Sequence, residues 1–130
     1  MIRILPVLLL FPVLISCTAK TDKKAKVADK RELLAVDEAF SQLSSEKGMK
    51  SAFVEYIDSN GVLLRPNEMP IIGANAIDYL IQLSDTDYTL TWQPNGAGIA
   101  ESGDLGYTYG VYAMKPKAKD TTIYGTYTSI

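Results

Sequence analysis

The sequence predicts an α+β fold in which helices come first and antiparallel strands follow. After residue 29, apolar residues recur at steps of three and four, which is typical of amphipathic helices. From residue 88 onward, segments in which apolar and polar residues alternate are separated by short runs rich in Gly, Asp and Ser. This pattern indicates strands joined by turns. The chain has 130 residues, a length that suits one domain.

The first two helices are expected between Asp29 and a turn at 58–61. Asp29 and Glu32 have the spacing of a capping box, in which the aspartate caps the first turn and the glutamate reaches back. The apolar face of this helix carries Leu33, Val36, Phe40 and Leu43. Gly48 is expected to end it, and a shorter helix is expected over 52–57.

The rest of the chain is expected to form one more helix and five strands. A short strand at 62–65 precedes a helix that begins near 73–75 and runs to about 83. The later strands are expected at 88–93, 96–101, 105–115 and 121–130. Gly106, Gly110 and Gly125 within these strands predict a strongly curved sheet wrapped around the first helix. The sequence stops in mid-strand, so we expect a further strand beyond residue 130.

The start of the chain resembles a bacterial lipoprotein signal peptide. One cation, Arg3, precedes an apolar run at 4–15. The small residue Ser16 follows this run and stands directly before Cys17. We therefore expect residues 1–16 to be removed, Cys17 to carry lipid, and the protein to face the periplasm or cell surface. An ordinary signal peptide cut elsewhere and a short membrane anchor are the alternatives.

Charge and composition exclude several functions. Residues 18–31 carry six basic and two acidic side chains, whereas 32–130 carry six basic and 13 acidic ones. We expect 17–28 to be a basic tether and 29–130 to be an acidic domain that does not bind nucleic acid. The chain has no histidine, and its one cysteine is Cys17, which removes Cys/His zinc sites and Ser-His or Cys-His catalysis. No cofactor or metal is expected.

Four stretches make the domain similar to the nuclear transport factor 2-like superfamily, in its SnoaL-like and ketosteroid-isomerase-like branch. They lie at 61–66, 73–77, 90–92 and 102–108, and 125–130 resembles the strand that follows. The resemblance implies a cone, with three N-terminal helices packed into a curved, mainly antiparallel sheet and a pocket at the open end. Members of this superfamily include both enzymes and binding modules, so the fold does not determine the activity.

The resemblance does not supply the isomerase machinery. The position of the isomerase base matches Arg65, and that of its tyrosine matches Phe40, which has no hydroxyl. We therefore expect a ligand-binding site with Arg65 as polar anchor. Its aromatic walls are expected from Tyr56, Trp92 and Tyr107. The alternatives are an exposed ion pair for Arg65 and ordinary packing for the aromatic residues.

Two functions stay open at this point. The first is a membrane-tethered module that binds a small, partly apolar molecule without catalysis, and this molecule can be anionic. The second is a cofactor-free isomerase, dehydratase or hydrolase that uses a carboxylate or tyrosine as acid or base. Asp37 and Glu38 on the first helix are candidate carboxylates, and a carboxylate buried against the pocket would favour the enzyme. A homodimer through the sheet is a further expectation.

Overall fold

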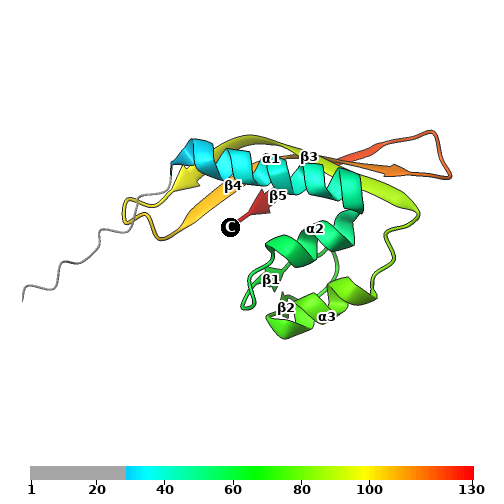
Figure 1. Cartoon of the computed structure of the whole chain (residues 1–130), viewed down its shortest axis with the longest axis horizontal. Helices are drawn as coiled ribbons and strands as arrows, with labels where there is room; N and C mark the ends of the chain where they lie inside the picture. The colour runs from blue at the N-terminus through cyan, green and yellow to red at the C-terminus, as the bar shows by residue number, and fades with distance from the viewer. Residues whose placement is uncertain (1–28) are drawn as a thin grey trace, which may run out of the picture.

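The computed structural model describes residues 29–130 and confirms the α+β class (Figure 1). The helices are α1 (Lys30–Lys47), α2 (Met49–Tyr56) and α3 (Ala74–Gln82). The strands are β1 (Val62–Leu63), β2 (Ile71–Ile72), β3 (Tyr88–Ile99), β4 (Gly106–Pro116) and β5 (Ile123–Ser129). The expected signal peptide, Cys17 and the tether lie outside the described residues. None of the helices in 29–130 has the length and apolar character needed to cross a membrane.

The two ends of α1 are defined by the residues that the sequence indicated. The Asp29 side chain caps the helix by accepting a hydrogen bond from the Arg31 N–H at 3.1 Å. Gly48 ends it with φ at +91°, a conformation in which a side chain would be strained. A Cβ at Gly48 would also meet the Asp85 carboxylate, which accepts a hydrogen bond from the Lys50 N–H at 2.7 Å at the start of α2.

Strands β3, β4 and β5 form one antiparallel sheet in that order, and β1 pairs with β2 in a separate ribbon. The expected strands at 88–93 and 96–101 are one continuous strand, so this prediction was wrong. Pro94, Asn95 and Gly96 have the composition of a turn, but the register shifts between Pro94 and Gly96 instead. The strand absorbs the additional residue as a bulge, and Pro94 is tolerated because β3 is an edge strand.

The sheet is not strongly curled, in contrast to the curvature that its glycines predicted. Three glycines of the sheet, of which only Gly125 was among those that predicted the curvature, make room for tyrosine rings from the neighbouring strand. A Cβ at Gly96, Gly98 or Gly125 would collide with the ring of the cross-strand tyrosine. The pairs are Gly96 with Tyr109, Gly98 with Tyr107 and Gly125 with Tyr112. These glycines therefore accommodate flat rings rather than bends, and the cone-shaped arrangement stays a prediction.

Helix α1 lies along the sheet and covers the edge of β3. The Ser41 hydroxyl donates to the carbonyl oxygen of Trp92 at 2.7 Å and accepts from its N–H at 2.8 Å. The Ser44 hydroxyl donates to the Leu90 carbonyl oxygen at 2.6 Å. Backbone groups that face away from β4 thus find partners on the helix, which accounts for two buried serines on α1.

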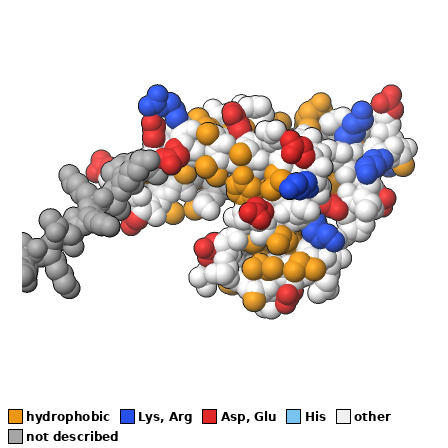
Figure 2. All heavy atoms as spheres, viewed as in Figure 1, with side chains coloured by type: hydrophobic (Ala, Val, Ile, Leu, Met, Phe, Trp, Pro, Cys, Tyr) orange, Lys and Arg blue, Asp and Glu red, His pale blue; other side chains and the backbone are white. Residues whose placement is uncertain are grey.

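Helices α2 and α3 and the β1–β2 ribbon lie to one side of α1 (Figure 1). Their buried apolar residues are Met49, Ala52, Ala76 and Leu80. Figure 2 shows hydrophobic side chains gathered along the face that carries α1 and α2, with charged side chains of both signs around them. The small core leaves aromatic residues of α1, α2 and the sheet to fill the space between the helices and the sheet.

Candidate functional site

The carboxylate of Asp37 is buried between α1 and the sheet, with only 5 % of the residue exposed. The indole Nε1–H of Trp92 donates to its Oδ1 at 2.7 Å. The phenol of Tyr127 donates to its Oδ2, also at 2.7 Å. Residues far apart in the sequence, on α1, β3 and β5, therefore meet at one side chain. We call these three residues the Asp37 network.

Helical spacing and strand register explain how the Asp37 network forms. Asp37 shares one face of α1 with Phe40, Ser41 and Ser44, so the face that bonds to β3 also carries the carboxylate. Trp92 of β3 lies opposite Tyr112 of β4, which lies opposite Gly125 of β5. Tyr127 lies two residues further along β5 and therefore on the same face of the sheet as Trp92. Both donors therefore point to the side on which α1 lies.

Aromatic rings enclose the Asp37 network. Phe40 meets Trp92 edge to face, with ring centroids 4.6 Å apart, and stacks on Tyr56 at 4.5 Å. Burial, together with the hydrogen bond to the Asp37 carboxylate, raises the pKa of Tyr127 above its usual range. The phenol therefore keeps its proton near neutral pH and remains a donor to Asp37.

A hollow of about 160 Å³ opens beside the Asp37 network, and we call it the Asp37 hollow. It is bordered by Leu33, Asp37, Phe40, Tyr56, Gly106, Tyr107, Thr108, Ser129 and Ile130. Thr108 is only 4 % exposed, and its Oγ1 has no hydrogen-bond partner among the described residues. The Asp37 hollow thus combines aromatic walls with two buried polar side chains.

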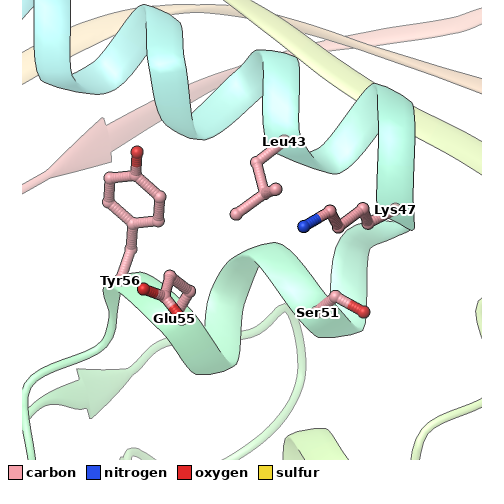
Figure 3. A pocket seen from close by; sticks show the side chains of 5 residues that line it. All are labelled: Leu43, Lys47, Ser51, Glu55 and Tyr56. Carbon is pink, nitrogen blue, oxygen red and sulfur yellow. The ribbon is translucent and has the colours of Figure 1, made fainter.

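A second and larger hollow, of about 470 Å³, lies between α1 and α2. Figure 3 shows Leu43 and Tyr56 projecting into this space. Lys47 reaches in from the end of α1, and Glu55 lies on α2 beside Tyr56. Both charged side chains are exposed to solvent, and Ser51 points away from the other residues. Of the two hollows, only the Asp37 hollow is bordered by buried polar side chains, those of Asp37 and Thr108. We therefore take it as the candidate site.

The structure brings together some of the predicted site residues. Tyr56 borders both hollows, and Trp92 belongs to the Asp37 network. Tyr107 borders the Asp37 hollow, but its ring lies across Gly98. Successive strand residues point to opposite faces, so this ring lies on the face opposite Thr108, which is buried.

Arg65 lies elsewhere and borders neither hollow. Its Nε is 3.9 Å from a carboxylate oxygen of Glu68, and its guanidinium lies 5.3 Å from the centre of the Tyr79 ring. This arrangement matches the exposed ion pair that was the alternative for Arg65. Arg65 therefore supplies no cation to the Asp37 hollow.

Sequence reasoning missed Tyr127 and Thr108 and gave Asp37 only a minor place. Both residues lie in alternating strands, where the pattern gives the face of a side chain but not which side chains of α1 lie against it. The one available signal was Asp37 itself, a charged residue on the apolar face of α1 beside Phe40. Glu38, the other candidate carboxylate, is exposed to solvent.

Within residues 29–130, Asp37 does not belong to any cluster of Asp, Glu, Cys or His side chains that could hold a metal ion. Comparisons with family models, with curated proteins and with solved structures found no match to this chain. The candidate site therefore has to be interpreted from its own chemistry.

Proposed function

We propose that this protein is a membrane-tethered lipoprotein whose domain binds a small, partly apolar molecule in the Asp37 hollow without catalysis. The observation that carries the proposal is a hollow with aromatic walls beside a buried carboxylate. Ligand sites combine apolar walls with a few placed polar groups in this manner. The volume is close to that of an engineered apolar cavity that accepts benzene, so the ligand, or the end that enters, has the size of one ring.

The position of Asp37 in its network favours binding over catalysis. Each carboxylate oxygen already accepts a short hydrogen bond, from Trp92 or from Tyr127. These contacts join α1 to β3 and β5 and give the carboxylate a role in holding the site together. The alternative, a cofactor-free isomerase, dehydratase or hydrolase, draws support from the same buried carboxylate, and it would use Asp37 as the acid or base.

We also propose that the domain is a SnoaL-like member of the nuclear transport factor 2-like superfamily. The three helices and the antiparallel sheet of β3, β4 and β5 that follows them support this proposal, as does the position of α1 against the sheet. Of the stretches that carry the resemblance, 102–108 and 125–130 include residues that border the Asp37 hollow. A homodimer formed through the sheet belongs to the same proposal.

Toluene is a suitable first probe of binding, because it is apolar and close to the volume of the hollow. In ¹H–¹⁵N spectra of the protein, toluene should shift the amide signals of Asp37, Tyr56 and Thr108. Leu33→Phe should fill the Asp37 hollow and abolish these shifts. The matched variant Leu43→Phe, in the larger hollow between α1 and α2, should keep them. Unchanged spectra at saturating toluene would show that the hollow does not bind a purely apolar ligand of this size.

The membrane tether is tested separately. Replacing Cys17 with serine removes the thiol that would carry lipid, so the Cys17→Ser protein should leave the membrane fraction. The washes need high salt, because the basic residues of the tether are attracted to anionic lipid headgroups. A variant that sediments with membranes as the wild type does would rule out a lipid anchor at this position.

A further inference from the structure

We infer that the polar end of the Asp37 hollow recognises a hydroxyl group, which donates its proton to Asp37 and accepts one from Thr108. This inference rests on the proposed ligand binding and adds the chemical class of the ligand: a neutral alcohol or phenol of about one ring. It arises from two buried side chains with complementary hydrogen-bonding needs.

Thr108 supplies the first observation. Its hydroxyl is buried on β4, and no described residue accepts its proton or donates to its oxygen. Nearly all buried hydroxyl groups in proteins have a hydrogen-bond partner, and leaving one without a partner is destabilising. Since Thr108 borders the Asp37 hollow, a group bound there can become that partner.

Asp37 supplies the second observation. The indole N–H of Trp92 can only donate, and the phenol of Tyr127 donates to the other oxygen, so the carboxyl group is used as a double acceptor. Each carboxylate oxygen can accept two hydrogen bonds, and each oxygen receives one of these two bonds. The remaining site on each oxygen is suited to a ligand that carries a hydrogen-bond donor.

A hydroxyl group satisfies both residues at once. An ether or carbonyl would accept from Thr108 but could not donate to Asp37. An ammonium group would donate to Asp37 but leave the Thr108 proton without an acceptor. The Oγ1 of Thr108 is itself covered, so a ligand reaches it only as a neighbouring side chain moves aside.

The volume sets the size of the hydroxyl-bearing group. A space of about 160 Å³ holds a six-membered ring with one substituent, beside the stacked rings of Phe40 and Tyr56. A larger ligand would have to leave the rest of its structure outside the hollow.

The experiment compares phenol, anisole, toluene and benzylamine in NMR titrations of the wild-type protein. Phenol should bind about 10- to 100-fold more tightly than toluene, which is the range expected for a hydrogen bond to a charged group. Anisole keeps the oxygen but cannot donate, so it should gain only the hydrogen bond from Thr108, about three- to tenfold over toluene, and bind less tightly than phenol. Benzylamine can donate to Asp37, but its ammonium group must lose its hydration and it leaves Thr108 without a partner, so it should bind less tightly than phenol.

Two variants of Thr108 complete the test. Thr108→Val has nearly the same shape but no hydroxyl, and it should reduce the preference for phenol about three- to tenfold while toluene binds as before. Thr108→Ser keeps the hydroxyl and should keep the preference. If Thr108→Val does not fold, the phenol and anisole comparison in the wild type still decides.

Each result has a separate meaning. Equal affinities for phenol and toluene in the wild type would overturn the inference and leave the proposed function intact. A loss of toluene binding in Thr108→Val would also overturn it, because Thr108 would then be shaping the hollow. Failure of all four probes to bind would instead reject the proposed function.

Discussion

Replacing Asp37 with leucine or with asparagine separates the roles of its hydrogen bonds and its charge. Leucine is similar in size but leaves the Trp92 N–H and the Tyr127 hydroxyl without their acceptor. Each unsatisfied buried donor costs about 1–3 kcal/mol. Tyr127 is only half-buried and can turn towards water, so we expect Asp37→Leu to lower the free energy of unfolding by about 2–4 kcal/mol. Domains of this size are stable by only about 5–15 kcal/mol.

Asparagine should be tolerated far better. Its Oδ1 can still accept from the indole of Trp92, and its Nδ2 can donate to Tyr127, because a phenol oxygen also accepts hydrogen bonds. Both bonds lose their charged partner, which weakens each by roughly 1 kcal/mol. Removal of a buried charge offsets part of that loss. We expect a net destabilisation within about 1–2 kcal/mol for Asp37→Asn.

Urea unfolding measures both variants, with fluorescence as the signal, because Trp92 is the single tryptophan and belongs to the network. The wild type and an exposed-site variant, Glu38→Gln, serve as references. Equal destabilisation by leucine and asparagine would show that the charge matters rather than the pattern of donors and acceptors. A change below about 0.5 kcal/mol for Asp37→Leu, the size expected of an ordinary surface substitution, would refute the reasoning.

Three further predictions concern other parts of the structure. Since the pKa of Tyr127 is raised above 10.0 in the folded state, its phenol should ionise first in the unfolded state. Wild-type stability should therefore fall above about pH 10, by up to about 1.4 kcal/mol per pH unit more than Tyr127→Phe; parallel urea series from pH 8 to 11 would contradict this. Gly110→Ala should destabilise by more than Gly98→Ala in the same assay, because its Cβ would meet the Gln93 backbone, whereas at Gly98 it would meet the movable Tyr107 ring. Ser41→Ala should cost about 1–3 kcal/mol, because it unpairs two backbone groups of β3, and the exposed Ser45→Ala should change little.

Local patterns were sufficient to predict most of the elements. Asp29 and Gly48 mark the ends of α1 as expected, because capping depends on neighbours in the sequence. The second helix begins at Met49, three residues before the expected start. The continuous β3 was not predictable from its composition, since Pro94 and Gly96 fit a turn and a bulge equally well until β4 pairs with them.

The candidate site depends on long-range pairing, and there the sequence was less informative. Trp92 and Tyr56 were identified from their residue type, as aromatic side chains near an expected pocket. The contacts of Asp37 with Trp92 and Tyr127 require the position of α1 on the sheet and the register of β5, and neither follows from periodicity. Arg65 was chosen by alignment with an isomerase base, and its contact with Glu68 shows a different local environment.

The serines of α1 close part of the β3 edge of the sheet to further strands. Because Ser41 and Ser44 occupy backbone groups at the β3 edge, a newly arriving strand cannot pair there without displacing the helix. Within residues 29–130, β5 forms the other edge of this sheet. Any strand that joins it, from whichever chain, would pair beside Tyr127 and hence next to the phenol that holds Asp37. Strand addition and occupation of the Asp37 hollow would then influence each other through one tyrosine.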